Sequence, residues 1–86
     1  MQIGVMIGAD GAANTIDGVV NFAQNVEAKG LHNVWMANIF GFDAISTLSI
    51  VGRETQRIGL GTAVTPTYPR HPTALAQQAM TAAAAT

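Results

Sequence analysis

Three short apolar segments of this chain are each followed by a stretch with the apolar spacing of an amphipathic helix. The segments are residues 3–7 (IGVMI), 31–36 (LHNVWM) and 58–64 (IGLGTAV). Short apolar runs bounded by turn-forming residues are typical of strands that are buried on both faces. Alternation of such strands with helices predicts an α/β fold, in which parallel strands are joined by right-handed crossovers.

Each helical stretch carries signals for its ends. Asn14 can cap the first helix and Gly30 is its natural stop, whereas Asp43 is the expected N-cap of the second helix, which ends near Thr55. Pro72 suits the first position of a third helix that reaches about Ala85. The expected inner faces are Ile16, Val19, Val20, Ala23 and Val26 in the first helix, Ile45, Leu48 and Val51 in the second, and Leu75, Ala76, Ala79, Met80 and Ala83 in the third.

The strand-helix unit recurs about every 25 to 30 residues, and eight such units make up the roughly 250 residues of a closed (β/α)₈ barrel. The 86 residues hold three units, and the final AAAAT favours a helix but offers no cap. We therefore expect residues 1–86 to be the first three βα units of a (β/α)₈ TIM barrel. They would form the incomplete N-terminal part of a larger domain.

The composition limits the classes of partner. Charged residues make up 10% of the chain, against about 25% in an average soluble domain, so large faces are expected to be covered by other protein. A formal net charge of −1 gives no electrostatic footprint for nucleic acid. The absence of cysteine excludes a disulfide framework, a zinc ribbon and a thiol nucleophile. With no secretory or membrane-spanning pattern at the start, we expect a cytoplasmic protein that binds neither nucleic acid nor a membrane.

Familiar catalytic motifs do not explain the polar residues. The glycines of residues 8–11 and 59–61 do not fit the G-x-G-x-x-G fingerprint, and neither segment has the lysine of a P-loop. Ser46 and Ser49 lack a nucleophile elbow, and His32 and His71 lie too far apart to argue a metal site. His71 is either a neighbour of a helix N-cap or part of a site. The residues alone therefore identify no metal site and no catalytic group.

Ligands of parallel α/β sheets bind at the carboxyl ends of the strands. The three loops there, residues 8–13, 37–42 and 64–71, carry hardly any charge, which suits a flat, uncharged ring better than a sugar or a phosphate. Glycines inside the third strand indicate a bulge or a close ligand. Three prolines then stiffen the exit of that strand and can hold polar side chains in place: Tyr68, Arg70 and His71.

The segments IGVMIG, VWMANIFGFDA and GLGTAVTPTYPRHP, the last leading into LAQQAMT, resemble the bacterial luciferase-like superfamily. More narrowly, they resemble its coenzyme F420-dependent oxidoreductases, and the third segment is the most specific part of a likeness that spans all 86 residues. The resemblance implies a TIM barrel that transfers a hydride between coenzyme F420 and a small-molecule substrate. The close alternative in the same superfamily is an FMN-dependent monooxygenase that acts with molecular oxygen.

The resemblance also implies a cofactor site. A bulge in the third strand, with a non-prolyl cis peptide near Ala63 and Val64, would support one face of the ring. Asn38 and Thr65 would make polar contacts, and Trp35, if it does not point into the core, would form the pocket wall. Family members that act on sugar phosphates have an acid followed by histidine where this chain has Asn38 and Ile39, which argues against that substrate and that acid-base role.

Two alternatives of other classes remain open. The chain could be a non-catalytic, truncated half-barrel whose exposed sheet edge pairs with another copy, and a homo-oligomer is expected in that case. It could also be a small doubly wound α/β binding module, which would need helices on both faces of a complete sheet. Because the phosphate-holding loops of such barrels follow strands seven and eight, residues 1–86 alone are expected to bind a cofactor weakly or not at all.

Overall fold

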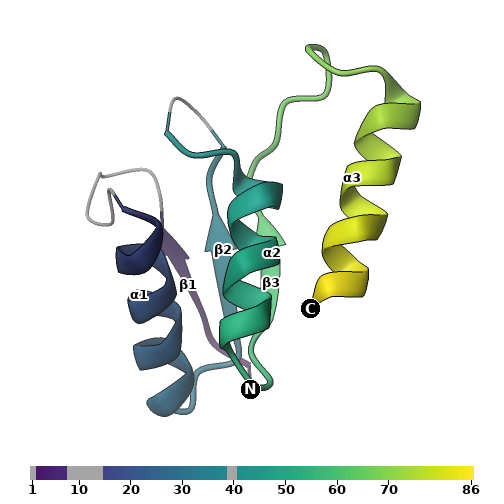
Figure 1. The fold of residues 1–86 in the computed structure, drawn as a ribbon. Helices are drawn as coiled ribbons and strands as arrows, with labels where there is room; N and C mark the ends of the chain where they lie inside the picture. The colour runs from purple at the N-terminus through teal and green to yellow at the C-terminus, as the bar shows by residue number, and fades with distance from the viewer. Residues whose placement is uncertain (1, 8–14, 39–40) are drawn as a thin grey trace.

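A computed structural model describes residues 2–7, 15–38 and 41–86 of the chain. The strands form one parallel sheet in the order β1-β2-β3, so the predicted parallel α/β alternation is confirmed. Each strand is shorter than the apolar run that predicted it. The elements, drawn in Figure 1, are β1 (Gly4–Ile7), α1 (Ile16–Ala28), β2 (Asn33–Met36), α2 (Ala44–Glu54), β3 (Gly59–Thr62) and α3 (Pro72–Ala85).

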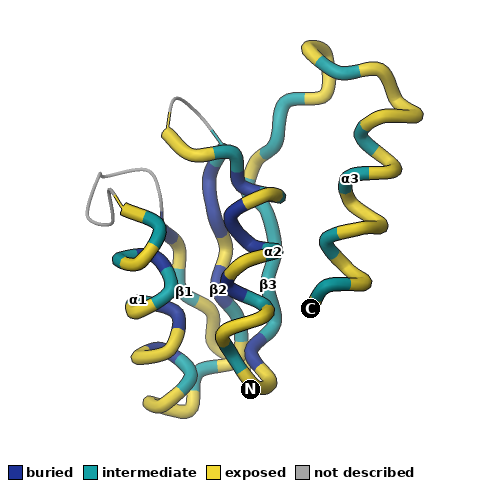
Figure 2. Tube along the Cα trace, viewed as in Figure 1, coloured by how far each residue is buried: buried dark blue, intermediate teal, exposed yellow. Residues whose placement is uncertain are grey.

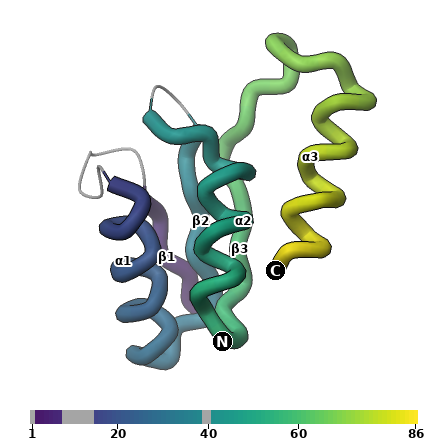
Figure 3. Tube along the Cα trace, in the orientation of Figure 1, coloured from purple at the N-terminus to yellow at the C-terminus, as the bar shows by residue number. Residues whose placement is uncertain are grey.

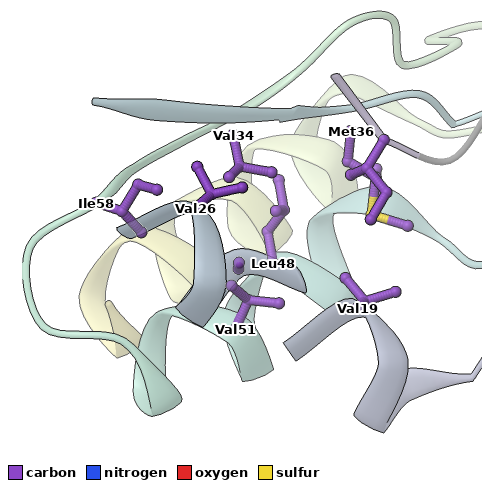
Figure 4. Packing of buried hydrophobic residues seen from close by; sticks show 10 residues of the cluster. Val19, Val26, Val34, Met36, Leu48, Val51 and Ile58 are labelled. Atoms are coloured by element: carbon purple, nitrogen blue, oxygen red, sulfur yellow. The ribbon is translucent and has the colours of Figure 1, made fainter. Parts of the chain in front are cut away.

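The core lies between one face of the sheet and the helices α1 and α2. Val34 and Met36 of β2 point toward these helices, where Val19 of α1 and Val51 of α2 meet them (Figure 4). Successive side chains of a strand point to opposite faces, so the residues between them face the other way. Val19, Val34 and Val51 are the largest fully buried side chains among the described residues.

The opposite face of the sheet is open. Met6 of β1 and Trp35 of β2, which pair in the parallel register, are 56% and 43% exposed. The expectation that the strands are buried on both faces is therefore wrong for this chain, because α1 and α2 pack against the same face (Figure 3). Within the described ranges, no helix covers the open face as a doubly wound module requires.

The helix ends follow local chemistry. Thr15, and not Asn14, caps α1, since its hydroxyl accepts a hydrogen bond from the Gly18 N–H at 2.9 Å. Asn14 itself lies outside the described residues. Gly30 follows α1 with a φ of +83°, the left-handed conformation that glycine adopts easily, and the predicted stop is confirmed. Asp43 caps α2, as predicted, by accepting the Ser46 N–H at 2.9 Å.

Helix α3 lies beside α2 and carries no buried residue (Figure 2). Of the predicted inner face only Leu75 is half-buried; the prediction is wrong for its other members, and Met80 is exposed. Alanine occupies so many positions of α3 that the apolar pattern selects no face, and polar contacts with α2 decide the orientation instead. The half-buried residues of α3 are Leu75, Gln78, Ala82 and Ala85.

Two residues join the elements at the amino ends of the strands. His32 immediately precedes β2 and accepts the Ile3 N–H on Nδ1 at 3.2 Å, as expected of a polar residue at the entry of this strand. The carboxylate of Glu27, at the end of α1, accepts the backbone N–H groups of Gln56, Arg57 and Ile58 at 3.1, 2.7 and 2.8 Å. The hydrogen bonds from the Arg57 and Gln56 N–H groups hold the pKa of Glu27 below its ordinary value of 4.5.

Replacing Glu27 with glutamine is expected to lower the free energy of unfolding near neutral pH, because the three N–H groups lose a charged acceptor. A carboxyl whose pKa is lower in the folded than in the unfolded state makes its full contribution to stability at pH values above the unfolded-state pKa, ordinarily 4.5. That contribution is lost as the pH falls through the folded-state pKa. The gap between the wild type and Glu27→Gln should therefore close in acid. Urea midpoints measured across this pH range test the prediction.

The matched control for this prediction is Glu54→Gln, which removes a carboxylate from an exposed side chain at the end of α2. Its urea midpoint should stay close to that of the wild type at every pH. A gap between wild type and Glu27→Gln that is the same at neutral and acid pH would contradict the role assigned to this carboxylate.

Candidate functional site

The carboxyl ends of β2 and β3 remain joined beyond the last residues of the strands. The Ala63 N–H donates to the Met36 carbonyl at 2.9 Å, and the Asn38 N–H donates to the Val64 carbonyl at 2.9 Å. Asn38 and Val64, which the sequence assigned to one site from different segments, therefore lie side by side. The loop of residues 8–13, expected at the same edge, and Ile39 lie outside the described residues.

Asn38 has a structural partner that sequence reasoning did not find. Its side-chain oxygen accepts the Ala44 N–H at 2.7 Å, so it satisfies one of the free donors in the first turn of α2. The side-chain nitrogen of Asn38 is then the atom that can donate to a ligand.

The segment that follows β3 presents the other expected site residues. The Ala63–Val64 peptide bond is cis, at the place that the family resemblance implies. Val64 is exposed, and the next residue, Thr65, is half-buried. The Thr65 hydroxyl oxygen is buried and has no hydrogen-bond partner among the described residues. A buried hydroxyl without a partner is uncommon in folded proteins, and it fits a polar contact with something that this chain binds.

Trp35 lies across the open face of the sheet, over glycines of both neighbouring strands. A Cβ atom on Gly61 of β3 would lie 2.5 Å from Cζ3 of Trp35, and one on Gly4 of β1 would lie 3.0 Å from its Nε1. The indole therefore spans all three strands and leaves a flat aromatic surface exposed. The sequence indicated that the glycines of the third strand make room for a ligand or a bulge, and the structure shows that Gly61 makes room for Trp35.

Replacing Gly61 with alanine is expected to lift the indole of Trp35 away from the sheet, because the added Cβ cannot share its space. The chain has one tryptophan, so its fluorescence reports this change directly: emission should move to longer wavelength as water reaches the ring. Gly41→Ala is the control, since a Cβ there meets no atom within 4 Å. Emission that is the same in Gly61→Ala and wild type would contradict the placement of the ring.

The loop between β3 and α3 holds the polar residues that the sequence singled out. The Arg70 N–H donates to the Thr67 carbonyl at 3.2 Å and closes a turn, while the Arg70 side chain pairs with Asp43. His71 is the N-cap of α3, with Nδ1 accepting the Thr73 N–H at 3.1 Å. The helix-capping alternative for His71 is therefore the one that the structure supports. Tyr68, at the tip of the turn, is 92% exposed.

Asp43, the N-cap of α2, is an ionisable group whose pKa is shifted by its surroundings. Partial burial acts to raise the pKa of Asp43. Hydrogen bonds from Ser46 and Arg70, together with the positive charge of Arg70, outweigh that effect and lower the pKa below its ordinary value of 3.8. Asp43 is thus a carboxylate near neutral pH. It serves as a structural anion, and its low pKa argues against a role as a proton donor.

Grooves flank α3 at some distance from Trp35 and Asn38. One, of about 570 Å³, lies between α2 and α3 and is lined by Ser46, Ser49, Ala74, Gln77, Gln78 and Thr81. Another, of about 580 Å³, runs along the loop and α3 and is lined by Thr67, Tyr68, Arg70, Pro72, Leu75, Ala76 and Ala79. We place the candidate site on chemical grounds on the open face of the sheet and at its carboxyl edge. The indole on that face, and the Asn38 amide and Thr65 hydroxyl at the edge, lie outside both sets of lining residues.

Comparison with known proteins assigns the family. The sequence profile of the luciferase-like monooxygenases matches residues 1–86. The chain belongs to the luciferase-like monooxygenase family. The resemblance noted in the sequence is therefore confirmed at the level of the family, whose general activity is that of an oxidoreductase or monooxygenase. No curated protein matches this luciferase-like chain.

The described part of this luciferase-like chain has two further properties. No group of three or more histidine, cysteine, aspartate or glutamate side chains within residues 2–7, 15–38 and 41–86 is placed to hold a metal ion. No helix in these ranges is long and apolar enough to cross a membrane.

Proposed function

We propose that these residues are the first three βα units of a (β/α)₈ barrel that transfers a hydride between coenzyme F420 and a small organic substrate. The observation that carries the proposal is the family match over residues 1–86. The parallel β1-β2-β3 sheet, with helices on one face and the other face open, is the arrangement of a barrel wall seen from its interior. The open edges of β1 and β3 would then pair with the remaining strands.

The residues at the carboxyl edge, together with Trp35 on the open face of the sheet, fit a flat ring. The exposed indole of Trp35 offers an aromatic surface, and the Thr65 hydroxyl lacks a partner among the described residues. In our proposal Ala63 and Val64 support one face of the ring, the Asn38 amide and the Thr65 hydroxyl contact its polar edge, and Trp35 forms the wall. The deazaflavin or flavin supplies the redox chemistry when bound, while the protein orients it and excludes water.

A flavin-dependent monooxygenase is the second candidate, because the matching family is described as luciferase-like monooxygenases. Both candidates use a planar tricyclic ring, and they differ in whether oxygen or the organic substrate takes up the reducing equivalents. The proposed contacts at Asn38, Thr65 and Trp35 serve either ring.

Titrating the chain with coenzyme F420 and with FMN, while following Trp35 fluorescence, tests the proposal. Because Trp35 is the only tryptophan, a ring that stacks beside it should quench its emission in a saturable way. FMN differs from riboflavin by a phosphate, which a free cation would bind. On the described part of the carboxyl edge the cation Arg70 is already paired with Asp43, so riboflavin should quench as strongly as FMN. Because binding by residues 1–86 alone is expected to be weak, the titration extends to the solubility limit of each ring. Tighter binding of F420 supports the first candidate and tighter binding of FMN the second, whereas no quenching by either at that limit contradicts the contacts proposed here.

The alternative of a non-catalytic chain that associates with itself is tested by measuring the molecular mass in solution. β1 and β3 are edge strands without a charged residue or proline, and such unprotected edges favour pairing with another chain. As the alternative to pairing with further strands of a barrel, we propose that these edges pair with another copy of the chain and give a homo-oligomer. Light scattering should give at least twice the 8.9 kDa of one chain, and a monomer at high concentration would contradict the pairing.

A further inference from the structure

Asp43 connects three separate elements at the carboxyl edge. It caps α2 through the Ser46 N–H, accepts a hydrogen bond from Nε2 of Gln78 in α3 at 2.9 Å, and pairs with Nη2 of Arg70 in the β3–α3 loop. The side chains of Asp43 and Arg70 are each 28% exposed, so the ion pair is partly shielded from water. Shielding and shared hydrogen bonds make such a pair stronger than an isolated pair on the surface.

The same N-terminus of α2 holds the beginning of the loop. The Asn38 N–H binds the Val64 carbonyl, and the Asn38 side-chain oxygen binds the Ala44 N–H, next to Asp43. Arg70 holds the end of the loop, since its N–H closes the turn onto Thr67 while its guanidinium reaches Asp43. Residues 64–70 are thus attached to the first turn of α2 at both ends, through Asn38 and through Arg70.

We propose that Asp43, Arg70 and Gln78 form a clasp that positions Val64 and Thr65 against the ring-binding edge. The inference rests on the proposed function, because it assigns these three positioning residues to the same ring site. A binding segment that is fixed in advance loses less conformational entropy when a ligand arrives, which raises affinity without a new contact. Nη1 of Arg70 is buried and has no partner among the described residues, so the guanidinium is held here through its Nη2 contact with Asp43.

The test compares Arg70→Gln and the milder Gln78→Ala with the wild type by two measurements on the whole chain. Hydrogen exchange at the amides of Asn38 and of residue 70, which donate to the Val64 and Thr67 carbonyls, should become about tenfold faster in Arg70→Gln, because the loop opens locally. The Kd for riboflavin, from quenching of Trp35, should rise by about tenfold in the same variant. Gln78→Ala should change both in the same direction by less, and Arg70→Lys should restore part of each.

Arg53→Gln is the matched control. Arg53 also joins α2 to α3, through Nη1 and the Ala85 carbonyl at 3.5 Å, but at the far end of both helices. Its removal should leave exchange at the amides of Asn38 and Arg70 and the Kd for riboflavin at their wild-type values, whatever it does to the melting temperature.

Each outcome decides between the clasp and its alternatives. Wild-type exchange at the amides of Asn38 and residue 70 in Arg70→Gln overturns the clasp. The clasp is also overturned if the amide exchange rates of Val19 and Val34 rise by the same factor as those of the loop, since that indicates a loss of global stability. It is likewise overturned if loop exchange becomes faster while the Kd for riboflavin stays unchanged. If the wild type binds neither riboflavin nor coenzyme F420, the proposed function fails, and loop exchange alone then decides whether the clasp holds the segment.

Discussion

Val34→Asp is expected to leave the chain unfolded. Val34 is 1% exposed and lies in the centre of the core between β2 and the helices α1 and α2. An ionised carboxylate without a partner costs several kcal/mol at such a position, and the total stability of a domain of this size is on the order of 5 kcal/mol. The far-ultraviolet circular dichroism should lose its helical signal, and the dispersion of the NMR spectrum should collapse.

Met6→Asp is the control on the same sheet. Met6 points to the open face, where it is 56% exposed, so the new carboxylate stays in water. This variant should fold, with a urea midpoint near that of the wild type. If Met6→Asp unfolds the chain as well, or if Val34→Asp folds with a wild-type midpoint, the assignment of the two faces of the sheet is wrong.

Trp35→Leu is expected to weaken binding of the ring by about tenfold or more, because stacking against an aromatic surface adds to the area that is buried. Leucine keeps an apolar side chain over Gly4 and Gly61 but provides no flat face. Since the variant has no tryptophan, its affinity is measured from the fluorescence of riboflavin and of coenzyme F420 themselves.

Tyr68→Leu controls for general loss of aromatic surface in Trp35→Leu. Tyr68 is 92% exposed at the tip of the β3–α3 loop, and in our account it does not touch the ring. Its replacement should leave both affinities unchanged. Equal losses in the two variants, or an unchanged affinity in Trp35→Leu, would contradict the use of Trp35 as the wall of the site.

Local signals were enough to predict the order of elements and most helix ends. Asp43 caps the helix that it precedes, and Pro72 begins the helix expected there, because both effects act within one turn. Burial was less predictable. In β1 every side chain is apolar or absent, so no alternation marks the face that meets the helices. In α3 the many alanines likewise leave no apolar pattern that marks one face as buried. The hydrogen bond from Gln78 to Asp43 orients this helix instead.

The site was predictable where the topology alone brings residues together. Parallel strands place their carboxyl ends at one edge, and Asn38 and Val64 meet there as expected. The Arg70 ion pair with Asp43 was not predictable, because a partner 27 residues away in the chain leaves no pattern in the sequence. The fit of Trp35 over Gly61 depends on the register of β2 against β3, which the strand pattern did not fix.

An NMR titration of the isotopically labelled chain with coenzyme F420, and separately with riboflavin, tests the central claim most directly. The account predicts saturable shifts of the backbone amides of Asn38, Val64 and Thr65 and of the indole N–H of Trp35. Shifts confined to the groove between α2 and α3, at Ser49, Gln77 and Thr81, would contradict it, as would a spectrum that neither ring changes even at its solubility limit, where weak binding becomes visible.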